Sequence, residues 1–321
     1  MTSPIQSSQA GRPVSHLAAL VALTGACALW GTSFASIKIC GVILVAGAGD
    51  VSPAFGPVLF TALRFTLAAL LVFALWPASR APLAFADWGP LLKVSFPMAA
   101  GFLFQGAGLA FTTATTSGFI TGLCVCLTPL LEWVAFRRRP SGRLAVAVAM
   151  AFVGTAMLTG GGRFAFSLGA GEILTLLSVL AYSFQILYTG QVADRIGPAP
   201  LTAWSFLLVA LCAWASSLAI APAAIAPALA AAFESGRFWA FFLITLAFAT
   251  LGASILMNLF QRHVRPTEAA VVYTTEPVFA GLFAILWIGW SEFPGFLGSI
   301  GAALMIAANL LVAVQSRPRT T

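Results

Sequence analysis

Two of the most apolar segments of the chain each contain a carboxylate and a proline. In "ITGLCVCLTPLLEWVAFRRRP" these are Pro129 and Glu132, and in "EAAVVYTTEPVFAGLFAILWIGW" they are Glu276 and Pro277. A charged side chain at the centre of a bilayer costs about 2.5–3.5 kcal/mol on insertion scales. Proline frees a backbone carbonyl one turn earlier and kinks the helix. Such a segment is tolerated where it faces a water-filled cavity.

Glu276 is the leading candidate for a functional residue because it lies near the middle of its apolar segment. We expect its carboxylate to recognise a substrate amine or to carry a coupling proton, with a structural hydrogen bond as the alternative. Arg64 also falls within an apolar segment. A substrate carboxylate, a structural or gating ion pair (Glu276 being one partner), or snorkelling would each account for it. Glu132 lies beside the arginines at 137–139, and a surface ion pair is expected for it.

Neutral polar side chains at similar depth extend this set. Tyr182 and Gln185 lie three residues apart on one helical face. The full set of predicted substrate-binding residues is Glu276, Tyr182, Gln185, Trp30, Gln105, Asn258, Tyr273 and Arg64. Hydrogen bonding between helices is the alternative for the neutral members. A cavity lined by these aromatic and amide groups would suit a small zwitterion or a planar metabolite.

The sequence does not assemble a catalytic or metal-binding site. His16 and His263 lie at the ends of apolar segments, and there is no Walker-type phosphate loop. The five cysteines lack CxxC or histidine spacing and are interpreted as packing residues. We therefore expect no catalytic residue, no metal and no cofactor, and we do not expect an enzyme.

The composition identifies the elements that must position these residues. The 321 residues are 60% hydrophobic and only 8% charged, with a mean hydropathy of +0.99. A soluble domain averages about 25% charged residues. The chain is therefore expected to be an all-α polytopic membrane protein whose surroundings are the lipid bilayer. Its net charge of +7 is spread between apolar runs rather than along one stripe, so nucleic acid is not an expected partner.

The charge-free runs predict ten transmembrane helices. Their expected ranges are 17–38, 54–76, 90–111, 115–136, 143–160, 170–191, 199–220, 238–260, 267–289 and 295–315. A loop with a short interfacial helix is expected within 221–236, and a turn at 112–117. Basic residues concentrate on one side of this topology, and only Lys38, Arg163 and Arg237 fall on the other. The positive-inside rule therefore places both termini, 1–16 and 316–321, in the cytoplasm, and a bacterial inner membrane is the expected location.

The two halves of the chain repeat each other. A shift of 148 residues places Pro129 on Pro277, and a shift of 152 places Trp30 on Tyr182. The predicted repeats are five helices each, over 17–160 and 170–315. Because five is odd, the second repeat must enter the membrane from the opposite face. Inverted repeats of this kind are typical of secondary transporters, with a site near the midplane between the halves.

Several motifs carry a family resemblance. "LWGTSFASIK", "LRFTLAALL", "TSGFITGLCVCLTPLL" and "PTEAAVVYTTEPVFAGLFAILW", in this order, resemble the EamA branch of the drug/metabolite transporter superfamily. The resemblance covers essentially the whole chain. It implies two inverted five-helix repeats and transport of small metabolites, often export of amino acids and their relatives. The family often closes the fourth span with Gly-Glu, where this chain has Phe136-Arg137-Arg138; Glu292 resembles the second such glutamate.

The function expected from the sequence is therefore secondary transport of a small organic molecule by alternating access. Export of amino acids or related aromatic metabolites is favoured, with a proton as a candidate coupling ion. An importer of another metabolite and a non-transporting scaffold or receptor are the alternatives. A scaffold would not need buried polar groups converging from both halves, which this sequence has.

Overall fold

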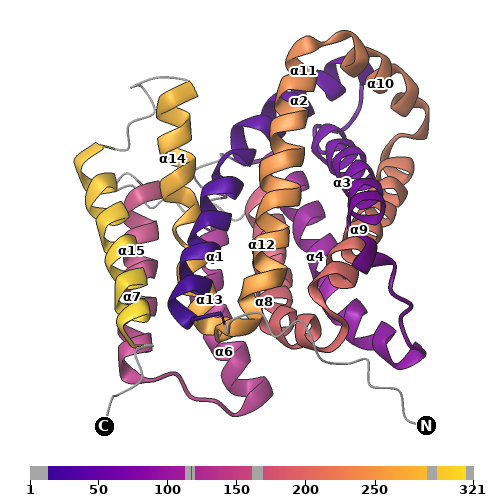
Figure 1. Cartoon of the computed structure of the whole chain (residues 1–321). Helices are drawn as coiled ribbons and strands as arrows, with labels where there is room; N and C mark the ends of the chain where they lie inside the picture. The colour runs from indigo at the N-terminus through magenta and orange to yellow at the C-terminus, as the bar shows by residue number, and fades with distance from the viewer. Residues whose placement is uncertain (1–13, 113–116, 118–119, 161–168, 288–294, 316–321) are drawn as a thin grey trace, which may run out of the picture.

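All regular structure in the described part of the chain is helical (Figure 1). The computed structural model describes residues 14–112, 117, 120–160, 169–287 and 295–315. Residues 1–13 of the predicted N-terminal tail, the predicted C-terminal tail at 316–321, residues 113–116 of the predicted turn, Arg163 and Glu292 lie outside the described residues. The first half contains α1 (His16–Gly31), α2 (Ser33–Ala48), α3 (Phe55–Leu75), α4 (Phe85–Leu109), α6 (Cys124–Phe136) and α7 (Gly142–Gly160).

The second half starts with α8 (Ala170–Ile196) and α9 (Pro198–Ile220). The short helix expected within 221–236 is present as α10 (Ile225–Glu234). A long helical stretch follows, made of α11 (Gly236–Ile244), a π-helical segment (Thr245–Gly252), α12 (Ala253–Phe260) and one short turn (Gln261–His263). The chain then forms α13 (Pro266–Tyr273), α14 (Glu276–Trp287) and α15 (Gly295–Gln315).

The outer surface of the bundle is apolar, as a membrane protein requires. Six helical stretches of the described chain are long and apolar enough to cross a membrane. Large hydrophobic side chains point outward, among them Leu286 at 75% exposed and Phe296 at 80%. Buried polar residues such as Arg64 and Gln185 lie inside. This arrangement suits lipid as the surrounding solvent.

Two helices are interrupted where the chain reaches the middle of the bundle. Between α1 and α2, the Thr32 hydroxyl bonds the carbonyl of Leu29 at 2.7 Å. Between α13 and α14, the hydroxyls of Thr274 and Thr275 bond the carbonyls of Val271 and Val272. The backbone N–H groups of the same three threonines bond these carbonyls as well, so the last carbonyls of each helix are satisfied and the break is tolerated inside the bundle.

The two prolines noted in the sequence behave differently. Pro277 is the second residue of α14, where the missing N–H costs nothing and the fixed φ favours helix initiation. Pro129 lies inside α6, which continues through it. The break near Glu276 thus agrees with the sequence prediction, whereas the break at Thr32 was not anticipated.

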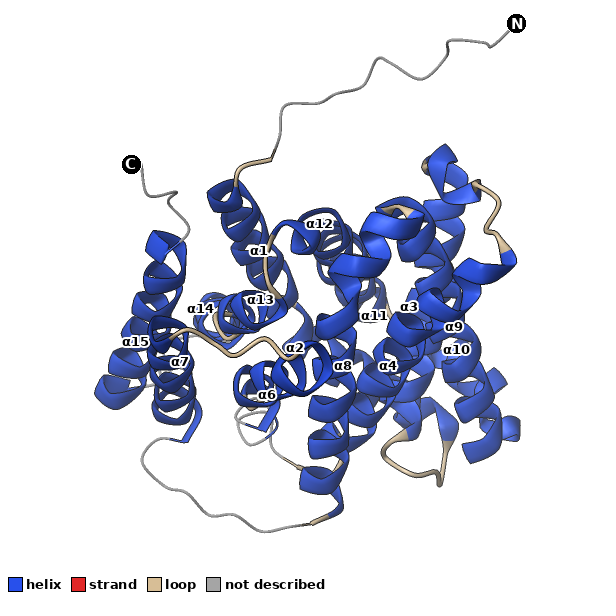
Figure 2. Ribbon diagram, turned by 90° about the horizontal axis from the view of Figure 1, so that it is seen from below, coloured by secondary structure: helices blue, strands red, loops and turns tan. Residues whose placement is uncertain are grey.

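The helices pack in pairs across the two halves. α3 packs on α9, α4 on α8, α1 on α12, and α7 on α15. Viewed end-on, α7 and α15 lie together at one edge of the bundle, and α9 and α10 lie toward the other (Figure 2). Small residues permit close approach: a Cβ on Gly154 of α7 would lie 2.7 Å from the carbonyl oxygen of Gly301 in α15.

Candidate functional site

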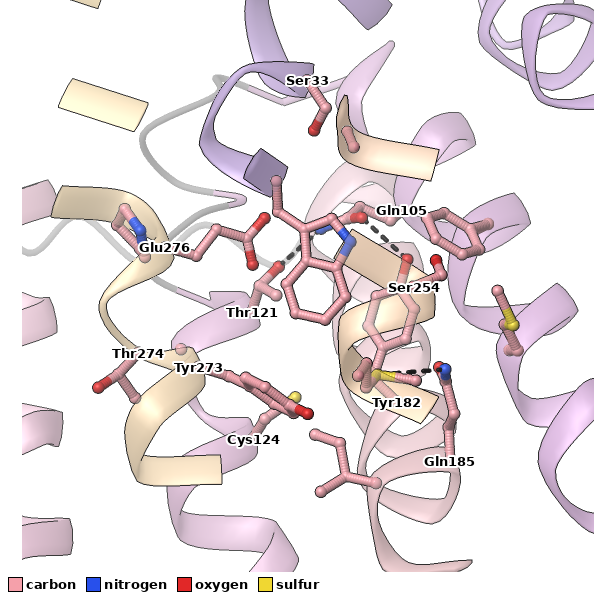
Figure 3. A pocket seen from close by; sticks show the side chains of 18 of the residues that line it. Ser33, Gln105, Thr121, Cys124, Tyr182, Gln185, Ser254, Tyr273, Thr274 and Glu276 are labelled. Atoms are coloured by element: carbon pink, nitrogen blue, oxygen red, sulfur yellow. Dashed lines mark hydrogen bonds between the residues drawn. The ribbon is translucent and has the colours of Figure 1, made fainter. Parts of the chain in front are cut away.

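The interrupted helices surround a central cavity with a volume of about 120 Å³. Its wall is formed by residues of α1, α2, α3, α4, α6, α8, the α12 stretch, α13 and α14, so both halves contribute (Figure 3). Of the predicted site residues, all but Asn258 line it: Trp30, Arg64, Gln105, Tyr182, Gln185, Tyr273 and Glu276. Glu276, Gln105, Tyr182, Gln185 and Tyr273 converge on one space in the close-up (Figure 3).

Asn258 differs from its predicted position. It is buried, at 3% exposed, but its Nδ2 donates to Oγ1 of Thr202 on α9 at 2.8 Å. Its neighbours Ser254 and Met257 line the cavity in its place. The preceding π-helical segment, Thr245–Gly252, changes the angular spacing of the residues that follow it. The face of this helix therefore could not be assigned from regular α periodicity.

A chain of hydrogen bonds fixes one wall of the cavity. The Tyr182 hydroxyl donates to Oε1 of Gln105 at 3.0 Å, and Nε2 of Gln105 donates to Oγ1 of Thr121 at 3.2 Å. These bonds connect α8, α4 and the segment before α6. The Tyr182 ring lies directly over Gly101 of α4, where an added Cβ would come within 2.3 Å of Cε1. The orientation of the Gln105 amide is set by these two contacts.

Aromatic rings also line the cavity. Trp30 and Tyr273 meet edge to face, with ring centroids 5.3 Å apart and an interplanar angle of 78°. The Tyr273 hydroxyl donates to Oε1 of Gln261 at 2.9 Å. Phe102 and Tyr182 make a similar edge contact at 5.7 Å. Edge-to-face pairs of this kind leave ring faces available for an apolar or cationic ligand.

Arg64 is a buried cation with no anionic partner among the described residues. Its side chain on α3 is 2% exposed, and its guanidinium carbon lies 5.5, 4.9 and 5.0 Å from the ring centroids of Phe60, Phe65 and Phe102. Cation–π contacts offset part of the desolvation cost but do not neutralise the charge. Its Nε atom has no hydrogen-bond partner in the described part of the chain.

Glu276 supplies the carboxylate of the cavity. It is half-buried and is the first residue of α14, where the positive end of the helix dipole favours a negative charge. No hydrogen bond or ion pair joins it to another described side chain, so the pair with Arg64 considered from the sequence is not formed. A guanidinium and a carboxyl group thus line one cavity, each without an ionic partner in the part of the chain described.

Several lining residues were not anticipated from the sequence. These are Ile37, Met98, Thr121, Ser254, Met257 and Thr274. Thr274 had a usable signal, because "TTEP" combines two hydroxyl residues with a carboxylate and a proline at the helix interruption. Met98 and Met257 had none, since flexible apolar side chains look the same in a sequence wherever they pack.

Glu132 also differs from expectation. It is fully buried rather than at the surface, and it pairs with Arg265 rather than with the arginines at 137–139. Among the described residues, no group of three or more His, Cys, Asp or Glu side chains is placed to hold a metal ion.

Comparison with known proteins agrees with the fold. The model of the EamA-like transporter family matches residues 17–160 and again 169–314. An uncharacterized transporter of Archaeoglobus fulgidus is 28% identical over 303 residues, which cover 92% of this chain and 84% of that protein. A protein of known crystal structure superposes with a TM-score of 0.71 at 17% identity, covering 94% of this chain and 99% of that one.

The structural likeness concerns the fold alone, whereas the family match covers most of the sequence in two consecutive copies. The family match, together with the apolar outer surface and the polar cavity between the halves, identifies the chain as a membrane transport protein. The chain belongs to the EamA-like transporter family.

Proposed function

We propose that this protein is a secondary transporter that exports small zwitterionic metabolites, amino acids and their aromatic relatives, by alternating access. The observation that carries the proposal is that the guanidinium of Arg64 and the carboxyl group of Glu276 line one cavity without an ionic partner among the described residues. A cargo with one carboxylate and one ammonium group would compensate both charges at once.

The energetics favour this interpretation over a structural role. A buried charge without a partner destabilises a fold by several kcal/mol. If Arg64 and Glu276 served only to stabilise the fold, apolar residues in their place would stabilise it equally well. The rings of Trp30, Tyr182 and Tyr273 lie in the same cavity and would pack against the remaining part of the cargo.

Helix packing supports ten spans arranged as two inverted repeats, with the repeats over 17–160 and 170–315. Exchanging the halves maps the contact of α4 with α8 onto that of α12 with α1. It likewise maps the contact of α6 with α8 onto that of α14 with α1. The spans beyond the six long apolar stretches would be α4, α6, α7 and the α13–α14 pair. A twofold relation of this kind underlies alternating access in secondary transporters.

The orientation follows from the arginine distribution, which favours cytoplasmic termini in a bacterial inner membrane. Reporter fusions after Arg80 and Arg139 should both read as cytoplasmic. An external reading at either position would reverse the proposed topology.

The cargo is tested by competition in proteoliposomes. Uptake of labelled phenylalanine is measured against phenethylamine, which lacks the carboxylate, and phenylpropionate, which lacks the amine. We expect Arg64→Met to weaken the binding of phenylalanine, the zwitterion, and of phenylpropionate, but not that of phenethylamine. Glu276→Gln should weaken the binding of phenylalanine and phenethylamine, but not that of phenylpropionate. If neither variant discriminates between the analogues, Arg64 and Glu276 do not recognise the charged groups of the cargo.

A further inference from the structure

A hydrogen-bonded ion cluster joins the two halves at one end of the bundle. Glu132, on α6, accepts from both Nε and Nη2 of Arg265, at 3.2 and 3.0 Å. Its other oxygen accepts from the backbone N–H of Thr267 at 3.2 Å and from the Thr267 hydroxyl. The Glu132 side chain is 1% exposed. Charge-assisted bonds of this kind are roughly twice as strong as neutral ones.

A second carboxylate extends the cluster to α1. Glu268 accepts from the backbone N–H of Arg265 at 2.9 Å and contacts Nε2 of His16 at 3.0 Å. Both acidic groups therefore lie at the N-terminus of α13, where the helix dipole favours negative charge. We name Glu132, Arg265, Thr267, Glu268 and His16 the latch.

The latch lies on the side of the bundle where α1 begins and α15 ends, which we name the terminal side (Figure 1). Trp30, on the cavity wall, follows His16 along α1 by about 21 Å at 1.5 Å per residue. α13 occupies the space between: its N-terminus is held by the latch, and Ala270, Tyr273 and Thr274 at its other end line the cavity.

α13 is a short, buried rod rather than a spanning helix. Thr267, Ala269, Ala270, Val271 and Val272 are all buried. The break at Thr274–Thr275 separates it from α14, so it can move without carrying the rest of that span. At its cavity end, Tyr273 bonds Gln261, whose amide nitrogen in turn donates to the carbonyl of Ile186 on α8.

We propose that α13 is the gate that closes the central cavity on the terminal side, and that Glu132 is the positioning residue that holds it shut from the other repeat. The proposal rests on the alternating-access function proposed above. Opening toward the terminal side requires α13 to leave α6, which breaks every bond to Glu132. The cluster thus sets the energy difference between the closed and open states without touching cargo.

The gate is tested by the side from which a cavity thiol can be labelled. Cys124 lines the cavity and serves as the reporter after Cys27, Cys40, Cys126 and Cys212 are replaced by alanine. A membrane-impermeant maleimide is applied to vesicles of either orientation. In the parent, labelling from the terminal side should be slow. Glu132→Gln should accelerate it by about tenfold or more, since each 1.4 kcal/mol of lost closed-state stability gives a factor of ten.

A second variant tests the gate in case Glu132→Gln misfolds. Thr267→Val keeps the shape of the side chain and removes the hydroxyl bond to Glu132, so it should shift labelling in the same direction by a smaller factor. Glu172→Gln is the matched control. Glu172 also accepts hydrogen bonds, from Gly169 N–H and the Thr112 hydroxyl, but at the start of α8 on the other side. Its loss should leave terminal-side labelling at the parent rate.

The outcomes separate the gate from the transport function, because labelling needs no cargo. Faster terminal-side labelling in the two latch variants, with Glu172→Gln unchanged, supports the gate even if no tested amino acid is transported. Unchanged labelling in both latch variants overturns it, whatever the transport assay gives. Equal acceleration in the latch variants and in Glu172→Gln also overturns it, since it would reflect general loosening of the bundle.

Discussion

The hydroxyl of Tyr182 on α8 donates a 3.0 Å hydrogen bond to the side-chain oxygen of Gln105 on α4. This bond couples the first helix of the second half to the fourth helix of the first half at the wall of the central cavity. The ring that carries the hydroxyl is seated on Gly101, which leaves it little room to rotate. The site is therefore held by a polar contact and a steric contact that can be removed separately.

Removing the polar contact gives the first prediction. Tyr182→Phe keeps the ring and deletes the bond to Gln105, so the Gln105 amide loses its orientation. The free energy of unfolding should fall by about 0.5–1.5 kcal/mol, the usual worth of such a bond. We expect KM for the zwitterionic cargo to rise several-fold. Thermal unfolding in detergent and transport in liposomes measure the two effects, and an unchanged KM would show that the amide does not orient the cargo.

Removing the steric contact gives the second prediction. The added methyl of Gly101→Ala would lie 2.3 Å from Cε1 of Tyr182, so the ring must move or α4 and α8 must separate. Both Tm and transport should drop. The control is Gly89→Ala on the same helix, where nothing lies within 4 Å of the added Cβ. That variant should match or exceed wild-type stability, because alanine is favoured over glycine in a helix by up to about 1 kcal/mol.

The charged and amide residues of the cavity lining, Arg64, Gln105, Gln185 and Glu276, could be predicted because such groups are rare in this chain. Only 8% of residues are charged, so Arg64 and Glu276 stand out within their apolar segments. In a membrane protein such groups must find a cavity or a partner. Glu276 lines the cavity as the first residue of α14, and Pro277 after it predicted an interruption of the helix at this point.

The remainder depended on geometry that no local pattern encodes. The face of Asn258 is altered by a π-helical segment whose sequence, "TLAFATLG", contains no breaker except its final glycine. Glu132 lies beside three arginines in the sequence, yet its partner Arg265 is 133 positions away. Long-range pairings of this kind follow from how α6 packs on α13, which single-sequence periodicity does not report.

The third prediction concerns pH. An ionised Glu276 would bind the ammonium group of the cargo, and a protonated one would not. Wild-type affinity should therefore fall as the pH is lowered through the range in which this carboxyl titrates. The Glu276→Gln variant should bind the cargo more weakly than the wild type at high pH, and its affinity should not change with pH. Transport assayed at several pH values with a fixed membrane potential tests this, and a variant that retains the wild-type pH profile would exclude Glu276 as the titrating group.

The fourth prediction uses the absence of an ion pair between Arg64 and any described carboxylate. Arg64→Met removes a buried, unpaired charge and keeps an apolar side chain against Phe60, Phe65 and Phe102. Stability should not fall, and relief of the unpaired charge should raise it. Zwitterion transport should nevertheless drop by at least about tenfold, since a charge-assisted bond to the cargo carboxylate is worth about 1.5–3 kcal/mol. The pattern is a gain in Tm with a loss of transport.

The double variant Arg64→Met/Glu276→Gln completes the test. Without a direct pair, the two changes in unfolding free energy should add to within about 0.3–0.5 kcal/mol, as they do for sites that share no contact. A structural ion pair predicts the opposite: each single variant would be destabilised because one charge is left alone, and the double variant would recover part of that loss. Tm and unfolding free energies of the three proteins without cargo distinguish the two cases. Recovery in the double variant would assign the charges to stability rather than to cargo recognition.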